Sequence, residues 1–282
     1  MPPASDTAAA PTPAPSARLT FDQSFAVARG RPGGIGLVPF VPAGYPSLDA
    51  TVDLLPALEA CGATVIEVGF PFSDPVADGP IIQEAFTHAL AKGAKVADVF
   101  AAVRAARPRV SVPIVGMLSY SIVFRYGLPR FIADAKAAGL DGLIIPDLPP
   151  PEAQRVTGTI HAGGLATSLL VAPTTAPDRR AEIAKLSTGF VYYLSVSGIT
   201  GERDQLPPDL ADSVRAVKAL TDRPVCVGFG ISKPHHMAML RGVADGAIVG
   251  SAIVRRMKEH ESAVPAAVTA AVRDYLTELT QV

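Results

Sequence analysis

Four segments of this 282-residue chain repeat one layout, in which a helix-like stretch ends at a glycine and a short apolar run follows. The glycines are Gly62, Gly139, Gly163 and Gly242. A glycine just past the end of a helix supplies the left-handed backbone conformation that stops it. A short unbroken apolar run is typical of a parallel strand that is covered on both faces. The layout therefore predicts alternating helices and parallel strands.

Extended to the whole chain, this pattern predicts eight strands, at residues 35–41, 64–69, 112–118, 141–147, 166–173, 190–194, 224–228 and 245–251. The spacers carry helical periodicity; Leu210, Val214 and Val217, for example, fall on one helix face. Eight strands in a body of about 260 residues favour a (β/α)8 TIM barrel of the α/β class. A doubly wound sheet is disfavoured because no strand is followed by a nucleotide-binding glycine motif.

The first residues differ from the rest of the chain. Residues 1–16 hold five prolines and no large apolar residue, and they lack the basic start and apolar run of a secretory signal. We therefore expect a disordered tail over residues 1–18. Residues 19–282 are expected to form a single barrel domain, with an extra N-terminal helix before the first strand.

Charge and cysteine content exclude several classes of protein. The charges of the 25 basic and 26 acidic residues nearly cancel. The chain has no run of five or more lysines or arginines, so its sequence does not predict a surface for nucleic acid or anionic membrane. No apolar stretch reaches the roughly 18 residues of a transmembrane helix. Cys61 and Cys226 are too far apart in sequence for metal-ligand spacing, and two cysteines do not make a disulfide scaffold. A reducing, cytoplasmic location is expected.

Glu67 is the ionisable residue in the otherwise apolar strand 64–69. Because side chains alternate along a strand, Glu67 points the same way as Val65 and away from Ile66 and Val68. If the latter two pack on helices, Glu67 points into the mouth of the barrel, where loss of water would raise its pKa toward neutrality. It would then serve as an acid or a base. A carboxylate paired with a nearby arginine is an equal alternative.

The loop at residues 70–80 holds three prolines and two aspartates, Asp74 and Asp78. One aspartate would face the same cavity as Glu67, and the other would cap the helix that starts near Ile81. For a generic loop aspartate, capping or turn formation is the favoured interpretation.

The last two strands are followed by glycine-rich segments, residues 228–232 and Gly250-Ser251. Loops after the seventh and eighth strands of a barrel, with a helix N-terminus, commonly hold a phosphate group. Residues 195–206 form a long polar loop that would either close over a substrate or remain an ordinary surface loop.

Two other chemistries are disfavoured. All seven lysines fall in predicted helices or loops, which argues against a Schiff-base lysine at a strand end. His235 and His236 are adjacent and face different ways on a helix, so we expect a solvated face rather than a metal site. Acid–base chemistry by carboxylates on a phosphorylated small molecule remains, with no metal.

Residues 66–80, IEVGFPFSDPVADGP, resemble the signature of the tryptophan synthase alpha chain family. The similarity extends over nearly the whole body through residues 39–46, 145–149, 197–201, 228–232 and 250–254. One departure is Ser121, which stands near an interface loop where asparagine is common in the family.

The resemblance implies a carbon–carbon lyase of tryptophan biosynthesis, which cleaves indole-3-glycerol phosphate to indole and glyceraldehyde 3-phosphate by a retro-aldol reaction. It implies that Glu67 is the acid–base residue and that Asp78 accepts the indole N–H and stabilises charge on the ring. The positions that match the family's indole pocket are Phe40, Ile82, Met117, Tyr192 and Phe229. Those that match its phosphate site are Gly201, Gly230, Gly250 and Ser251, with Thr200 in the loop that closes over substrate.

The resemblance also implies a partner, a beta chain that carries pyridoxal phosphate, in an α2β2 tetramer; the alpha chain itself carries no cofactor. A stand-alone indole-3-glycerol phosphate lyase and a regulatory subunit with weak activity of its own remain alternatives. A sugar-phosphate epimerase is the enzymatic alternative, but it usually needs metal-binding histidines at strand ends, and this chain lacks them.

Overall fold

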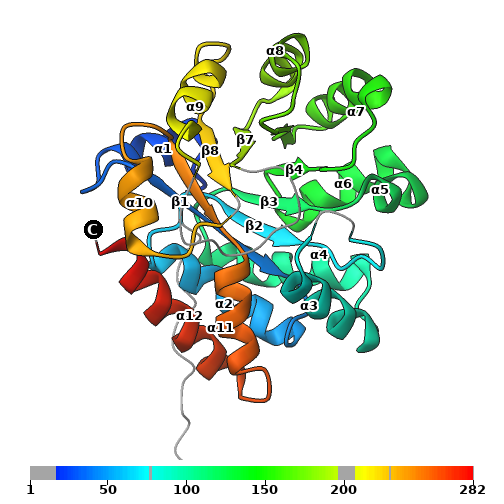
Figure 1. Ribbon diagram of the computed structural model, residues 1–282. Coiled ribbons are helices and arrows are strands. Elements are labelled where there is room, and N and C mark those ends of the chain that lie inside the picture. Colours follow the sequence, from blue (N-terminus) through cyan, green and yellow to red (C-terminus); the bar gives the residue numbers. More distant parts are fainter. Residues whose placement is uncertain (1–16, 76–77, 196–206, 229, 282) are drawn as a thin grey trace, which may run out of the picture.

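The computed structural model describes residues 17–75, 78–195, 207–228 and 230–281, and its strands gather at the centre of a ring of helices (Figure 1). The strands are β1 (Gly36–Pro42), β2 (Ile66–Gly69), β3 (Ile114–Met117), β4 (Gly142–Ile144), β5 (Ala166–Thr167), β6 (Leu170–Val171), β7 (Val191–Leu194), β8 (Val225–Gly228) and β9 (Gly246–Val249).

Helices follow the strands in alternation, as the glycine-ended layout predicts. They are α1 (Phe21–Arg29), α2 (Leu48–Ala60), α3 (Pro80–Ala91), α4 (Val96–Ala106), the 3-10 turn η1 (Arg107–Arg109), α5 (Tyr120–Tyr126), α6 (Leu128–Ala138), α7 (Pro150–Ala162), α8 (Pro177–Leu186), α9 (Leu210–Lys218), α10 (Pro234–Leu240), α11 (Ser251–Glu259) and α12 (Pro265–Thr280). Within the described ranges, no helix is both long and apolar enough to cross a membrane.

The strands form one parallel sheet that closes on itself. Their order is β5-β4-β3-β2-β1-β9-β8-β7-β6, so the two ends of the sheet are β5 and β6. These two are pieces of the single strand predicted at residues 166–173. The ladder continues between them, because Ser168 N donates to Leu143 O at 3.1 Å and Tyr192 N donates to Leu169 O at 3.0 Å. The predicted eight-stranded barrel is confirmed, with its fifth strand split in two.

Alternate residues along each strand fill the barrel or pack on the helices. The interior cluster consists of Phe25, Val38, Val65, Val115, Ile144, Phe190, Tyr192, Cys226 and Ile248. Ile66 and Val68 belong instead to the cluster under the helices. Phe25 comes from α1, the predicted extra helix, which Thr20 caps by accepting from Gln23 N. The Phe25 ring lies against the first residues of β1 and β9, so α1 covers the amino end of the barrel.

The tail predicted over residues 1–18 lies outside the described residues as far as residue 16. Arg18 already contacts the barrel: its guanidinium donates to Gly139 O at 2.9 Å and to Asp141 Oδ1 at 2.6 Å.

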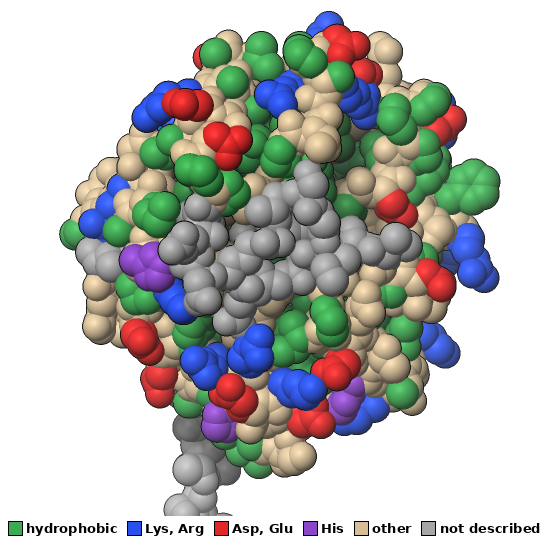
Figure 2. Space-filling view, viewed as in Figure 1, with side chains coloured by type: hydrophobic (Ala, Val, Ile, Leu, Met, Phe, Trp, Pro, Cys, Tyr) green, Lys and Arg blue, Asp and Glu red, His purple; other side chains and the backbone are tan. Residues whose placement is uncertain are grey.

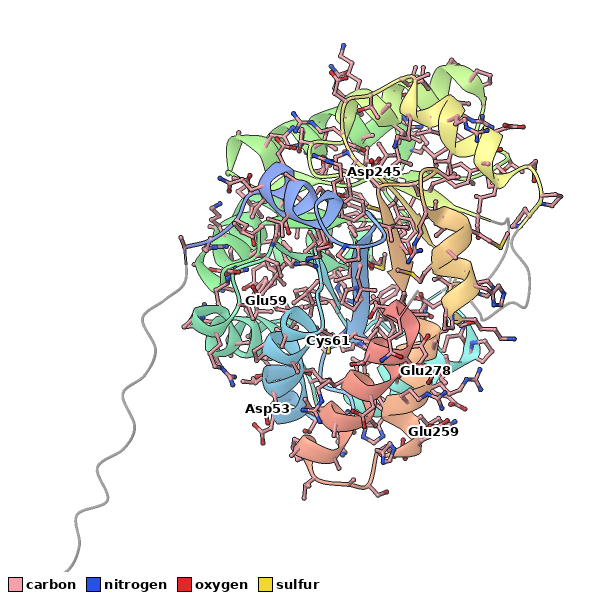
Figure 3. All side chains as sticks on the ribbon, turned by 90° about the vertical axis from the view of Figure 1, so that its left-hand side faces the viewer. Asp53, Glu59, Cys61, Asp245, Glu259 and Glu278 are labelled. Carbon is pink, nitrogen blue, oxygen red and sulfur yellow. The ribbon has the colours of Figure 1, made fainter. Side chains whose placement is uncertain are left out.

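Four side chains at the amino end of the barrel clamp neighbouring strands in pairs. Asp141, just before β4, accepts from Ile114 N at the start of β3 (2.9 Å). Asp245, just before β9, accepts from Val225 N of β8 (2.9 Å). It lies close to α9, whose Lys218 contacts it (Figure 3). The other two clamps use threonine: Thr64 accepts from Leu37 N and Thr188 from Thr167 N. The clamps therefore join β1 to β2, β3 to β4, β5 to β7 and β8 to β9.

Helix α2 contains a proline, Pro56, which has no N–H to donate to the carbonyl of Val52. Arg109 supplies the missing donor, because its Nη2 lies 3.1 Å from Val52 O. A side chain from η1 thus satisfies the backbone group that the proline leaves without its helical partner.

Candidate active site

Glu67 lies at the centre of β2, in register with Phe40 of β1 and Val115 of β3. Its side chain is fully buried and points into the barrel, on the side of Val65, as alternation predicts. Neither carboxyl oxygen has a hydrogen-bond partner among the described residues, so the alternative of an arginine-paired carboxylate is wrong. Burial raises the pKa of Glu67 well above its usual range, which favours the protonated acid at neutral pH.

Tyr192 reaches toward the same region from β7, on the opposite side of the barrel. Its hydroxyl lies over β8, where a β-carbon at Gly228 would be 2.5 Å from the Tyr192 oxygen. Burial raises the pKa of Tyr192 well above its usual range, and the charges of Glu67 and Asp78 raise it further. The Tyr192 hydroxyl therefore lies within electrostatic range of both carboxyl groups.

Asp78 approaches from the loop between β2 and α3. The N-cap of α3 is Gly79, so neither Asp74 nor Asp78 occupies the capping position, and the prediction that one of them caps this helix is wrong. Both aspartates instead line one cavity of about 340 Å³. Burial raises the pKa of Asp78 to about 6. A carboxylate in this position ionises close to neutral pH and can accept a hydrogen bond from a ligand.

The cavity walls are mostly apolar, as expected for a flat aromatic ligand. They comprise Phe70, Phe72, Asp74, Pro75, Asp78, Phe86, Met117, Leu118, Ser119, Pro146 and Asp147. Met117 was predicted from the sequence, whereas Phe86 was missed although it lies one helical turn after the predicted Ile82. Ser119 and Asp147 were missed as well. They join the loops after β3 and β4, because Ser119 Oγ donates to Asp147 Oδ2 at 2.6 Å.

Two further predicted pocket residues are buried beside this region. Phe40 and Ile82 are each 4% exposed. The Phe40 ring lies between Gly69, at the end of the Glu67 strand, and Gly250, at the start of α11. It therefore lies between the end of the Glu67 strand and the segment that the sequence assigns to phosphate.

The predicted phosphate site is partly described. Gly250 is the N-cap of α11, which begins at Ser251 and has no side-chain cap, so its first-turn amides are available to an anion. Gly230 follows β8 with a φ of +92°, a conformation that favours glycine. Thr200, Gly201 and Phe229 lie outside the described residues, as does the loop at residues 196–206.

The histidine pair differs from the prediction. His235 is exposed, as expected for a solvated face, but His236 is fully buried. Its Nδ1 accepts from the backbone N–H of Ser232 at 3.2 Å. The prediction failed because the turn before α10 needs an acceptor that helical periodicity alone does not reveal.

Acidic and basic side chains are interspersed over the described surface in Figure 2, without a large field of one sign. This mixture agrees with the formal net charge of −1.

Comparison with known proteins links this chain to one family. The sequence profile described as Tryptophan synthase alpha chain matches residues 27–280. A protein of that name from Rippkaea orientalis is 44% identical over 224 residues, which cover 79% of this chain and 84% of that protein. One from Chloroflexus aggregans is 44% identical over 248 residues, covering 88% and 92%. The solved tryptophan synthase A-subunit of the hyperthermophile Pyrococcus furiosus is similar with a TM-score of 0.81 and 37% identity, covering 88% of this chain and 98% of that one.

Proposed function

This chain belongs to the tryptophan synthase alpha chain family, and we propose that Glu67 and Asp78 catalyse its reaction, the cleavage of indole-3-glycerol phosphate to indole and glyceraldehyde 3-phosphate. One observation carries the assignment of residues. A fully buried carboxyl group with no hydrogen-bond partner among the described residues points into the barrel, and a second carboxyl group of raised pKa, Asp78, lines the cavity formed by the loops after β2, β3 and β4. An unpaired buried carboxyl group lowers the stability of the fold, so we infer that it is retained for chemistry.

Glu67 suits the proton transfers of a retro-aldol cleavage. The bond between indole C3 and the glycerol chain breaks once C3 is protonated, because the ring then accepts the bonding electrons. Burial raises the pKa of Glu67, which favours the protonated acid, and in the proposed mechanism this acid donates that proton. Its carboxylate then takes the proton of the hydroxyl whose carbon becomes the aldehyde, and the enzyme returns to its starting state.

Asp78 suits the other end of the indole ring. Protonation at C3 places positive charge on the ring nitrogen, and a carboxylate that accepts the N–H stabilises that charge. A pKa of about 6 keeps Asp78 mostly ionised at neutral pH. Glu67 and Asp78 thus take the roles of acid and anion because their surroundings bury them to different degrees.

The chain is proposed to bind the substrate phosphate at Gly201, Gly230, Gly250 and Ser251. Phe40, Ile82, Met117, Tyr192 and Phe229 are proposed to line the indole pocket, with Thr200 in the closing loop. We further propose that it works in an α2β2 tetramer, that pyridoxal phosphate belongs to the beta chain, and that the alpha chain needs no cofactor. A cytoplasmic location agrees with the free thiols of Cys61 and Cys226.

The test is release of indole from indole-3-glycerol phosphate by the purified chain, alone and with a tryptophan synthase beta chain. Glu67→Gln keeps the shape of the side chain but not its proton, so we expect turnover to fall by at least about a hundredfold. Asp78→Asn should also lower turnover strongly. Glu84→Gln is the matched control, because Glu84 is an exposed carboxylate on α3.

Strong stimulation by the beta chain would support the synthase subunit over the stand-alone lyase. A folded Glu67→Gln variant that releases indole at the wild-type rate would overturn the assignment of Glu67. No indole from the wild-type chain under either condition would leave a regulatory subunit as the better description.

A further inference from the structure

Ser232 and Lys233, just before α10, are held by a buried side chain outside the proposed phosphate contacts. His236 Nδ1 accepts from Ser232 N at 3.2 Å and from Lys233 N at 3.4 Å. A ring nitrogen that accepts two N–H groups carries no proton of its own. His236 is fully buried and Ser232 is 8% exposed, so the N–H of Ser232 has little access to water.

The backbone carbonyl of Ser232 is held by the C-terminal helix, α12. Tyr275 of α12 donates its hydroxyl to Ser232 O at 3.0 Å. Ser232 is therefore fixed through its N–H by His236 and through its carbonyl by Tyr275. Gly230, with its positive φ, lies two residues before this fixed point.

Tyr275 also contacts α11, the helix whose start forms the other half of the proposed phosphate site. The guanidinium carbon of Arg256 lies 5.4 Å from the centre of the Tyr275 ring. Arg256 belongs to α11, the helix that begins at Gly250 and Ser251. Helix α12 packs against both α10 and α11 (Figures 1 and 3). One side chain of α12 thus contacts Ser232, two residues after Gly230, and Arg256 of the helix that begins at Ser251.

We propose that His236 and Tyr275 are positioning residues for phosphate: they fix the turn after β8 so that Gly230 faces the start of α11 at the correct separation. The inference rests on the proposed function, because it assumes that these two segments bind the substrate phosphate. Removing the acceptor at His236 would leave the poorly hydrated N–H of Ser232 without this acceptor. The turn would then shift to satisfy this group and would carry Gly230 with it.

The experiment compares four variants for indole release and for its inhibition by inorganic phosphate. His236→Leu removes the acceptor. His236→Asn restores one, because its side-chain carbonyl replaces Nδ1 at the same distance along the side chain. Tyr275→Phe removes only the hydroxyl. His235→Gln is the matched control, since His235 is the exposed neighbour on the same turn. Thermal unfolding of each variant establishes that it is folded.

For His236→Leu, we expect the KM for indole-3-glycerol phosphate and the inhibition constant of phosphate to rise together by about tenfold, or about 1.4 kcal/mol. Turnover at saturation should stay within about twofold, because the carboxylates are untouched. His236→Asn should recover most of the loss. Tyr275→Phe should raise both constants by a smaller factor, and His235→Gln should change neither.

A folded His236→Leu or Tyr275→Phe variant with wild-type constants would overturn the role of that residue. Equal losses in kcat and in phosphate affinity, not rescued by asparagine, would indicate a general structural role and overturn the proposal. A wild-type chain that cleaves the substrate but is not inhibited by phosphate would overturn the phosphate site itself. A wild-type chain without activity would point to failure of the proposed function.

Discussion

The ring of Phe40 occupies the space that a side chain at Gly69 would need. A β-carbon at Gly69 would lie 2.6 Å from two ring carbons of Phe40 and 3.2 Å from Phe86. Phe40 is also the register partner of Glu67, two residues before this glycine. The glycine therefore sets how closely an aromatic wall approaches the proposed catalytic strand.

Gly69→Ala should push the Phe40 ring away from the end of β2. We expect kcat/KM for indole release to fall by about tenfold or more, and stability to fall by about 1–3 kcal/mol, because the site is overpacked. Steady-state kinetics and urea unfolding measure the two effects. Gly158→Ala is the control: it lies in α7, where a β-carbon would meet nothing within 4 Å, and it should not lower stability. Similar effects of the two substitutions would contradict the role of the Phe40 contact.

Asp78 should make stability depend on pH. Burial raises its pKa from 3.8 to about 6, so the folded chain holds this proton more tightly than the unfolded chain. The contribution of the Asp78 proton to the stability of the folded chain is complete below about pH 4, and it is lost as pH rises through about 6. The Asp78→Asn side chain does not ionise. The melting temperature of this variant minus that of the wild type should therefore increase between pH 4 and pH 7. A difference that stays constant over this range would show that Asp78 is not the titrating group.

Activity should follow the opposite trend. The wild-type chain needs the Asp78 carboxylate to accept the indole N–H, so turnover should fall as pH decreases through about 6. Steady-state rates at saturating substrate, measured across this range, test the direction.

Asp141 should contribute strongly to stability. Its carboxylate contacts Arg18 at 2.6 Å, Arg107 at 3.0 Å and the backbone N–H of Ile114 at 2.9 Å. Asp141→Ala leaves the largely buried Arg107 guanidinium without this partner, so we expect a loss of about 3 kcal/mol or more in urea unfolding. Asp22→Ala, which breaks an exposed pair with Arg223, should cost less than about 1 kcal/mol. Equal losses would contradict this interpretation.

Arg109 and Pro56 should be energetically coupled. Arg109→Met removes the donor to Val52 O and should cost about 1 kcal/mol in the wild-type chain. In a Pro56→Ala background the new amide of residue 56 can donate to the same carbonyl, so the cost should fall by more than half. A double-mutant cycle of urea unfolding measures the coupling. Additive effects would show that the Arg109 contact does not compensate for the proline.

Sequence patterns were sufficient for the barrel and for the direction of Glu67. Parallel strands covered on both faces give apolar runs that are easy to recognise, and alternation within such a run decides which way a side chain points. The same reasoning missed the split in the fifth strand. That split depends on the two-residue connection at Ser168 and Leu169, which still pairs with the neighbouring strands.

Contacts between distant loops were not predictable in this way. A loop aspartate can cap a helix or face a cavity, and only the backbone position of Gly79 decides against capping at Asp78. Ser119 and Asp147 meet across two different βα loops, and no local pattern records such a contact. The burial of His236 likewise depends on the turn that it supports.

The strand clamps at the amino end indicate where this chain tolerates new termini. Each clamp joins two successive strands of the eight-stranded barrel, through Thr64, Asp141, Thr188 or Asp245: β1 with β2, β3 with β4, β5 with β7, and β8 with β9. A circular permutant opened between β2 and β3 keeps every clamped pair on one continuous stretch of chain. One opened between β3 and β4 leaves Asp141 to close the two ends of the polypeptide against each other, at a greater entropic cost. The clamps thus divide the eight strands of the barrel into four pairs.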